Sequence, residues 1–281
     1  MPACAMMPNN ITATAGAGLR RSCIPATGPH RPRRDPDGGA DASAADGPPL
    51  THSPFMIDLL PTPLPDNPFE TLTAWLEEAT LRAHQPNPNA MTVATVDADG
   101  TPSIRVVLLK ALVTDLGYLV FYTNYQSRKG QAIAANPQVA CCLHWDALGL
   151  QVRVEGIAVP SPGEESDAYF ASRDPASQLG AWGSDQSRPL VSREALIAQT
   201  LARGRELGLP ESTTLAEVNP PDGVLPRPAH WGGYRVWARA MELWVDGAAR
   251  IHDRARWERP LVIADDDQAQ PGAWRAQRLQ P

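Results

Sequence analysis

Short runs of alternating hydrophobic and polar residues dominate the chain after residue 90, and they predict strands. The runs 91–97 and 103–110 flank the turn 97–100 and predict a β-hairpin. Further strands are expected at 118–123, 139–145, 150–159, 232–238, 240–246, 250–257 and 273–279. Helical spacing of hydrophobic residues predicts helices that cover 128–136, 161–173 and 191–207 and one that begins near residue 67. This order favours a mainly β, α+β protein built as a closed or split antiparallel β-barrel with intercalated helices.

Two segments do not follow this pattern. Residues 1–55 are rich in Ala, Gly, Pro, Ser and Arg, which predicts a disordered N-terminal extension. Residues 1–34 contain several Arg and no Asp or Glu, as transit peptides do, but scattered prolines argue against an amphipathic targeting helix. We therefore expect a dispensable tail, or an upstream start codon with Met56 as the working start, before a single domain over 56–281. The proline-rich segment 208–230 predicts a surface loop.

Composition narrows the class of protein. The chain has 281 residues, 43% of them hydrophobic, which is enough for one large domain or two small ones. A net charge of -6 argues against a nucleic-acid partner, and no apolar run approaches the ~20 residues needed to span a membrane. The adjacent Cys141 and Cys142 fall in a predicted strand and face opposite sides, so we expect no disulfide framework and a reducing, cytoplasmic location. His and Cys do not cluster at ligand spacing, so no metal is expected.

Cationic segments stand out against this acidic background. Ser127 can cap a helix whose first turn carries Arg128 and Lys129, although cations normally avoid a helix N-terminus. Either the turn is solvated, or a phosphate lies in front of it. Arg105 and Lys110 flank a four-residue apolar run that predicts a buried strand. Their odd spacing sends them to opposite faces, so the strand bends or the two cations serve different ligands, unless both simply extend into solvent from the strand ends.

Two further groups could bind anions. Tyr169 and Arg173 are four residues apart on a predicted helix and can converge on one anion, although a surface Tyr–Arg stack gives the same spacing. Arg250, His252 and Arg254 alternate along a predicted strand, which places them on one face. Two guanidinium groups and an imidazole on one face repel each other unless an anionic ligand lies across them.

These segments together resemble the pyridoxine/pyridoxamine 5'-phosphate oxidase family from about Ala90 to Pro281. The resemblance rests on RVVLLK (105–110), FYTNYQSRKG (121–130), QVRVEG (151–156), YFASRDPASQLGAW (169–182), QSRPL (186–190), WGGYRV (231–236), ELW (242–244), RIHDR (250–254) and the terminal RLQP, all in the family's order. It implies an FMN-binding split β-barrel, a homodimer with FMN at the subunit interface, and a C-terminal dimerisation and substrate region over 231–281.

The resemblance also implies a role for each site residue. FMN contacts are expected from Arg105, Val106, Val107, Leu108, Leu109, Lys110, Tyr122, Thr123, Arg128, Lys129, Gln151, Gln186, Ser187, Trp244 and Arg254. Substrate contacts are expected from Lys110, Tyr169, Arg173, Ser177, Arg250 and His252, of which Arg250 and His252 are the expected catalytic residues. The implied reaction converts pyridoxine 5'-phosphate or pyridoxamine 5'-phosphate to pyridoxal 5'-phosphate. A hydride passes from C4' to FMN, and O2 then accepts the electrons and yields H2O2.

Two departures keep alternatives open. No basic, aromatic segment of the kind that folds over the substrate in family members precedes the predicted helix at 67, and Asn87 stands where the family often has an acidic residue. One alternative is a split-barrel flavin reductase that acts on another substrate, although such an enzyme needs no second phosphate site. The other is a non-catalytic module that binds FMN or pyridoxal 5'-phosphate.

Overall fold

The computed structural model describes residues 5–6, 59–264 and 269–281. Of the predicted N-terminal extension, only the two-residue strand β1 (Ala5–Met6) is described. The rest of residues 1–55 lies outside the described residues, as do Met56 and two of the four cysteines, so the predictions made for them remain predictions.

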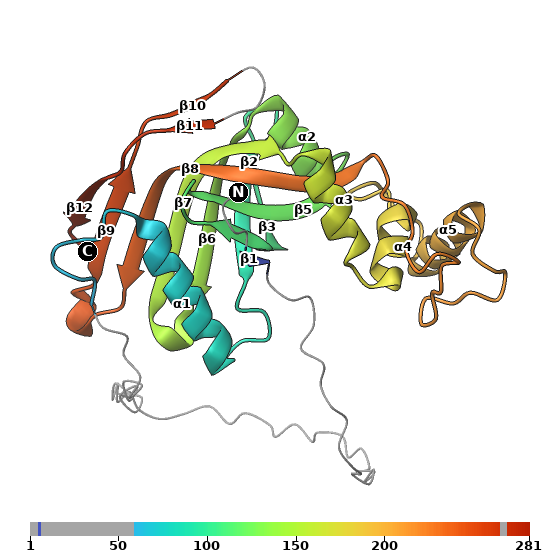
Figure 1. The fold of residues 1–281 in the computed structure, drawn as a ribbon, viewed down its shortest axis with the longest axis horizontal. Coiled ribbons are helices and arrows are strands. Elements are labelled where there is room, and N and C mark those ends of the chain that lie inside the picture. Colours follow the sequence, from blue (N-terminus) through green and yellow to red (C-terminus); the bar gives the residue numbers. More distant parts are fainter. Residues whose placement is uncertain (1–4, 7–58, 265–268) are drawn as a thin grey trace, which may run out of the picture. The chain divides into compact units, whose positions relative to one another are not determined.

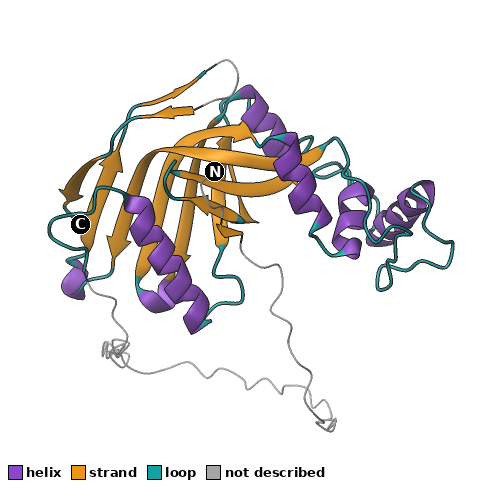
Figure 2. Cartoon of the chain, in the orientation of Figure 1, coloured by secondary structure: helices purple, strands orange, loops and turns teal. Residues whose placement is uncertain are grey.

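The described residues form a ten-stranded antiparallel sheet, as the alternating pattern predicts (Figures 1 and 2). Its strands run in the order β1-β4-β5-β8-β7-β6-β2-β3, and β9 pairs with both β8 and β12. The bounds are β2 (Ala90–Val96), β3 (Pro102–Leu108), β4 (Ala111–Val113), β5 (Tyr118–Asn124), β6 (Gln138–Trp145), β7 (Leu150–Pro160), β8 (Trp231–Val245), β9 (Asp253–Glu258) and β12 (Arg275–Leu279). A separate hairpin joins β10 (Leu261–Ile263) to β11 (Ala269–Pro271).

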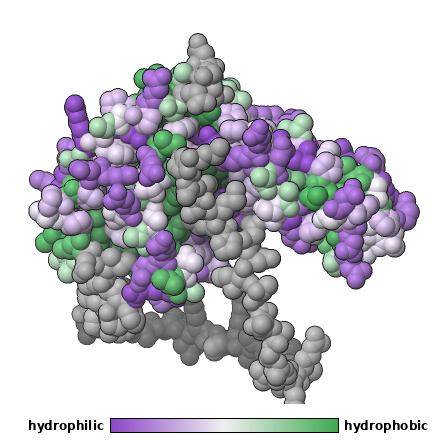
Figure 3. All heavy atoms as spheres, in the orientation of Figure 1, coloured by the Kyte–Doolittle hydropathy of each residue, from purple (hydrophilic) through white to green (hydrophobic). Residues whose placement is uncertain are grey.

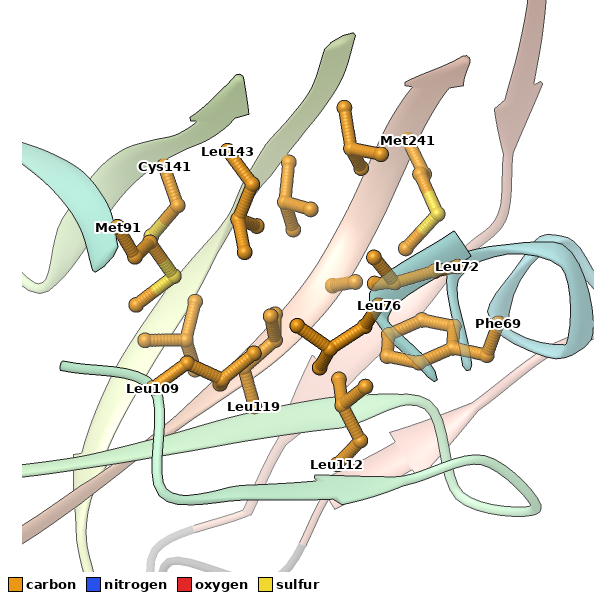
Figure 4. Packing of buried hydrophobic residues seen from close by; sticks show 14 of the residues in the cluster. Phe69, Leu72, Leu76, Met91, Leu109, Leu112, Leu119, Cys141, Leu143 and Met241 are labelled. Atoms are coloured by element: carbon orange, nitrogen blue, oxygen red, sulfur yellow. The ribbon is translucent and has the colours of Figure 1, made fainter. Parts of the chain in front are cut away.

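The main hydrophobic core lies between this sheet and helix α1 (Pro68–Arg82), whose apolar residues point toward the strands (Figure 4). The helix begins as predicted: Asn67 Oδ1 accepts a hydrogen bond from the Phe69 N–H at 3.1 Å, and Pro68 occupies the first helical position. Phe69 and Leu72 are fully buried against the strands. Burial of such side chains is worth about 1.5–3 kcal/mol each, which fixes α1 on the sheet.

The remaining helices lie at the end of the sheet where β8 begins (Figure 1). They are α2 (Arg128–Ala135), α3 (Gly163–Ala171), α4 (Pro175–Gly183) and α5 (Arg193–Glu206). No helix among the described residues is long and apolar enough to cross a membrane. On the face drawn in Figure 3, hydrophilic residues cover most of the described surface, with smaller hydrophobic patches between them.

Several local predictions were wrong, for identifiable reasons. The segments 232–238 and 240–246 form one continuous strand, β8, in place of two. Helix α4, which begins at Pro175 with the Asp174 side chain as its cap, was not predicted. The strand predicted at 250–257 begins only at Asp253. Prolines and short loops occur both where an element ends and where the next one begins. The local sequence pattern therefore does not fix the bounds of β8, α4 and β9.

The apolar run 106–109 was wrongly predicted to be buried along its length. In β3, half-buried and exposed residues alternate, and the exposed side chains are apolar. Ile104 is 71% exposed and Val106 is 65% exposed, whereas Leu109, just beyond the strand, is fully buried. The described part of the chain therefore leaves an apolar row on an edge strand open to solvent, which is unusual unless another surface covers it.

Candidate functional site

The first group of predicted site residues gathers at the N-terminus of α2. Ser127 caps this helix, because its Oγ accepts a hydrogen bond from the Gly130 N–H at 3.3 Å. Lys129 Nζ donates to Ser127 Oγ at 3.0 Å and to Gln186 Oε1 at 2.6 Å. Thr123 Oγ1, on β5, donates to the same Gln186 oxygen at 3.4 Å. The structure thus brings together residues from β5, α2 and the loop after α4, as predicted.

Arg105 joins this group from β3. Its guanidinium donates only to neutral oxygens: Val93 O at 3.1 Å, Thr95 Oγ1 at 2.8 Å and Ser103 Oγ at 2.6 Å. Arg128 instead pairs with Asp97, with Nη2 at 2.6 Å from Oδ2. We call Arg105, Arg128 and Lys129, with Thr123 and Gln186, the α2 cluster.

Positive charge exceeds negative charge in the α2 cluster, where Asp97 is paired with Arg128. Burial, and then the positive charge of Arg105, lower the pKa of Lys129 to about 8. Burial, and then repulsion from Arg128, lowers the pKa of Arg105, while Asp97 opposes this shift. The free N–H groups and positive dipole end of α2 add to the same field. An anion bound here would be stabilised by all of these groups, so the cluster fits a phosphate.

A second group surrounds an aromatic stack. The rings of Tyr122 and Tyr169 lie parallel at 3.9 Å, and Trp231 continues the stack at 5.5 Å from Tyr122. The Arg173 guanidinium lies 4.7 Å from the Trp231 ring centroid, and Lys110 Nζ lies 5.9 Å from the Tyr169 centroid. We call these five residues the aromatic cluster. Lys110 therefore lies near Tyr169 and Arg173, although it is far from both in the sequence.

This cluster also brings two cations, Lys110 and Arg173, close enough to repel each other. Arg173 Nη1 is buried and has no hydrogen-bond partner among the described residues. Burial lowers the pKa of Arg173, and burial together with repulsion from Arg173 lowers the pKa of Lys110. A buried, unpaired guanidinium donor costs free energy that an anionic ligand would recover. The aromatic cluster therefore also fits an anion.

The backbone at the start of β8 is shaped to fit these side chains. Gly232 and Gly233 pair with Thr123 and Tyr122 across the sheet. A Cβ atom on Gly233 would lie 2.9 Å from the Tyr122 ring, and one on Gly232 would lie 2.2 Å from the Tyr125 hydroxyl. Only glycine therefore allows the rings to lie this close to the strand.

Two further predicted site residues near this end of the sheet, Ser177 and Ser187, lie at the surface. Ser177 is exposed on α4, and its backbone N–H donates to the Asp174 carboxylate at 3.2 Å. Ser187 lies exposed in the loop before α5 with a φ of 72°, which a non-glycine residue rarely adopts. Among the described residues, neither serine forms a side-chain hydrogen bond with the two clusters, so the roles predicted for Ser177 and Ser187 remain predictions.

A third group lies at the other end of β8. Gln151 on β7 pairs with Trp244 on β8, and Trp244 pairs with Arg254 on β9, so the three side chains form a row across one face. Arg254 donates to the buried Glu242 through Nε at 3.1 Å and Nη2 at 2.8 Å. Its Nη1 donates to Gln280 O at 2.9 Å. The guanidinium is therefore held on two sides.

Arg250 and His252 belong to this third group, but not in the way that the alternation suggested. They lie in the loop between β8 and β9, and Arg250 is in a short 3-10 turn with a φ of 62°. The prediction that they share a strand face with Arg254 was wrong. His252 lies against the Trp244 ring, with centroids 4.6 Å apart, while Arg250 is exposed. We call Gln151, Trp244, Arg250, His252 and Arg254 the β8–β9 group.

The β8–β9 group is far from the other two clusters within one chain. Gly232, beside Thr123, and Trp244 are twelve residues apart on the same strand. At about 3.3 Å per residue, they are separated by roughly 40 Å of strand. One chain therefore presents the predicted site residues in two places, and a single small ligand cannot reach both.

Sequence reasoning missed several residues that hold the predicted ones. The buried Gln178 side chain donates to Arg173 O at 2.9 Å and so fixes the backbone beside that guanidinium. Glu242, only 3% exposed, holds Arg254. From the sequence, Trp231 is expected to be a core residue, but its ring also stacks against the Arg173 guanidinium. The sequence signal for each was only a polar or aromatic residue in a predicted element, and its partner lies far away in the chain.

Comparison with known proteins gives consistent matches. A family model described as pyridoxamine 5'-phosphate oxidase matches residues 77–207, and one described as the pyridoxine 5'-phosphate oxidase C-terminal dimerisation region matches residues 231–281. Pyridoxine/pyridoxamine 5'-phosphate oxidase of Jannaschia sp. (strain CCS1) is 45% identical over 221 residues, which cover 77% of this chain and 95% of that protein. The protein of the same name from Caulobacter vibrioides (strain NA1000 / CB15N) is 45% identical over 217 residues, covering 77% and 86%.

Solved structures agree on the fold. PhzG from Burkholderia lata 383, in complex with tetrahydrophenazine-1-carboxylic acid, matches with a TM-score of 0.65 and 30% identity, and covers 81% of this chain and 100% of that one. A pyridoxamine 5'-phosphate oxidase-related, FMN binding protein from Nostoc punctiforme PCC 73102 matches with a TM-score of 0.54 and 16% identity, covering 76% and 98%. The predicted split β-barrel is confirmed.

Proposed function

Because the chain belongs to the pyridoxine/pyridoxamine 5'-phosphate oxidase family, we propose that it is an FMN-dependent oxidoreductase that makes pyridoxal 5'-phosphate. Its substrates are pyridoxine 5'-phosphate and pyridoxamine 5'-phosphate, and O2 accepts the electrons to give H2O2. The observation that carries this proposal is the presence of two separate clusters of cationic side chains, the α2 cluster and the aromatic cluster, at one end of the barrel. An enzyme that joins a phosphorylated flavin to a phosphorylated substrate needs both.

FMN is the cofactor, and the α2 cluster fits its phosphate. Lys129 and Arg105 are half-buried cations that donate hydrogen bonds to neutral groups among the described residues, and they lie at a capped helix N-terminus. The FMN phosphate would restore the solvation that burial removes from Lys129 and would neutralise its repulsion with Arg105. Arg128 differs, because it already pairs with Asp97, so its expected share in binding is smaller.

The aromatic cluster fits the phosphate of the substrate. The buried Arg173 Nη1 supplies a donor without a partner among the described residues, and Lys110 supplies a second cation. The two cations lie against neighbouring rings of one aromatic stack, Lys110 near Tyr169 and Arg173 near Trp231, so both can reach the same phosphate. Ser177, exposed on the neighbouring helix α4, remains a proposed third contact.

We propose that a homodimer completes the site. The β8–β9 group lies roughly 40 Å of strand away from the two anion sites, so it must serve the site of a second subunit. Apart from Gln151, the members of this group fall within residues 231–281, the part that matches a dimerisation region. The exposed apolar row of Ile104 and Val106 on β3 supports the same conclusion, because such a row is normally covered by another surface.

The chain's own groups would then orient the substrate and handle its charge. FMN supplies the acceptor for the hydride that leaves C4'. Arg250, exposed at the tip of its loop, would stabilise negative charge that develops on the alcohol oxygen. Trp244 would pack against the flavin ring, while Gln151 and Arg254 would bind its polar edge. Glu242 and Gln280 keep Arg254 in place for that contact.

The alternative function, a split-barrel flavin enzyme that acts on another substrate, has one supporting observation. The structure of PhzG contains a carboxylic acid ligand whose name includes no phosphate. An enzyme of that kind would not need Lys110 and Arg173 as a second cationic site. Turnover separates the two. The proposal predicts that pyridoxamine 5'-phosphate yields pyridoxal 5'-phosphate and H2O2 in equal amounts and that unphosphorylated pyridoxamine reacts poorly. Equal rates with both compounds would contradict it.

A further inference from the structure

The loop between β8 and β9 is closed by a contact between Asp246 and His252 that the roles assigned so far do not include. Asp246 Oδ1 lies 3.0 Å from His252 Nδ1. The Gly247 N–H lies 2.9 Å from the same carboxylate oxygen and 3.2 Å from the same imidazole nitrogen. The other side of the imidazole lies against Trp244, at 4.6 Å between ring centroids. The ring orientation is therefore fixed from two directions.

These distances decide which imidazole nitrogen carries the proton. A carboxylate only accepts hydrogen bonds, so an unprotonated Nδ1 at 3.0 Å would place two acceptors against each other. The Gly247 N–H has its shorter partner in the carboxylate, which leaves Nδ1 free to donate its own proton to Asp246. Neutral His252 then presents Nε2 as an acceptor, and Nε2 has no hydrogen-bond partner in the described part of the chain.

No other carboxylate competes for this imidazole within the loop and the strands beside it. Asp253 pairs with Arg278, and Glu242 pairs with Arg254. The Asp246 side chain is 56% exposed and that of His252 is 21% exposed, so the pair lies at the surface with its open nitrogen accessible. Gly247 permits the arrangement, because a Cβ at this position would lie 1.9 Å from Ile251 O.

From this geometry we propose that Asp246 is a positioning residue that makes His252 the proton acceptor for the alcohol substrate. The proposal rests on the proposed function. Oxidation of pyridoxine 5'-phosphate breaks the C4'–H bond, whose electron pair leaves as a hydride to the flavin. It also breaks the O–H bond, whose proton passes to Nε2 of His252, and the C–O bond becomes C=O. The imidazolium that results keeps its Nδ1–H on the Asp246 carboxylate, which stabilises the new positive charge.

Oxidation of the amine substrate does not need this proton acceptor. When the free-base amine of pyridoxamine 5'-phosphate loses its hydride, the nitrogen lone pair forms the C=N bond, and no proton has to leave in that step. Asp246 should therefore matter for the alcohol and much less for the amine. It acts as a specificity residue between two substrates that the site otherwise binds alike.

The test compares Asp246→Asn with a matched control, Asp146→Asn. Asp146 is also a carboxylate near a histidine, 4.0 Å from His144, but its side chain is 98% exposed and it has no hydrogen bond to that ring. The measurement is single-turnover flavin reduction, anaerobic, with saturating FMN and each substrate in turn. An Asn can donate to Nδ1 and so favour the wrong tautomer, a change that costs roughly 10⁴ in serine proteases. Since this pair is partly exposed, we expect about a 10- to 100-fold loss with the alcohol and less than about threefold with the amine. The control should leave both rates unchanged.

A second readout is independent of turnover. In the FMN-loaded protein labelled with 15N-histidine, the nitrogen shifts of neutral His252 should report a proton on Nδ1 in the wild type and on Nε2 in Asp246→Asn. His252→Gln assigns the signals. Equal losses with alcohol and amine, or an unchanged tautomer, would overturn the proposal while leaving the oxidase function intact. A wild-type protein that reduces its flavin with neither substrate would overturn both.

Discussion

Arg173→Met should weaken binding of the phosphorylated substrate without affecting binding of FMN. Arg173 is the strongest candidate for the substrate phosphate, because its Nη1 is buried and lacks a partner among the described residues. Methionine retains length and apolar bulk against Phe170 and Trp231, so the aromatic cluster should stay packed. A charge-assisted hydrogen bond is worth about 1.5–3 kcal/mol. At 1.4 kcal/mol per tenfold, KM for pyridoxine 5'-phosphate should rise on the order of 10- to 150-fold.

The assay includes an internal control, because unphosphorylated pyridoxine cannot use this contact. Wild type and Arg173→Met should therefore have nearly equal kcat/KM for pyridoxine, and the penalty should appear only when the phosphate is present. FMN affinity, measured by flavin fluorescence, should be unchanged. Weaker FMN binding with an unchanged KM would refute the reasoning, because it would show that the two phosphate sites had been exchanged.

Three further outcomes follow from the structure. Protonated Lys129 is proposed to bind the FMN phosphate, and burial lowers its pKa to about 8, so the Kd for FMN should be flat from about pH 7 to 8 and rise up to tenfold per pH unit above pH 8. Lys129→Arg should remove this inflection, and the same inflection in that variant would exclude Lys129 as its source. Arg250→Met should slow flavin reduction by pyridoxine 5'-phosphate by ~10²–10³ with FMN saturated, and a wild-type rate would place Arg250 away from the reacting atoms. Deletion of residues 1–55 should leave melting and FMN binding unchanged, whereas loss of turnover alone would show that this segment covers the substrate.

The sequence predicted those features of the fold that depend on local chemistry. The start of α1 followed from Asn67 and Pro68, and the cap of α2 followed from Ser127. Alternation placed Cys141 and Cys142 on opposite faces of β6, where one is buried and the other is not. In each case the deciding contact lies within a few residues of the signal, so a local pattern suffices.

Features that depend on distant contacts could not be predicted in this way. Whether Val106 is buried or exposed depends on which element packs against β3, and the apolar run alone does not reveal this. In the structure Val106 is exposed. The loop that carries Arg250 uses left-handed backbone at Ala249 and Arg250, which neither residue type suggests. Glu242 and Gln178 hold site residues through partners that only the folded sheet and helices bring near. Strand alternation therefore grouped Arg250, His252 and Arg254 but gave the wrong geometry for the first two.

The division of site residues between two subunits can be tested by subunit complementation. Arg173→Met disables the substrate phosphate site of its own chain, and Arg250→Met disables the β8–β9 group that this chain would lend to its partner. The two variants are purified, mixed in equal amounts, unfolded and refolded with FMN, and assayed with pyridoxine 5'-phosphate. A symmetric dimer with shared sites predicts that half the dimers are hybrids with one intact site each, which restores about a quarter of the wild-type activity. Activity no higher than that of the separate variants would contradict the account, because each site would then be built from a single chain.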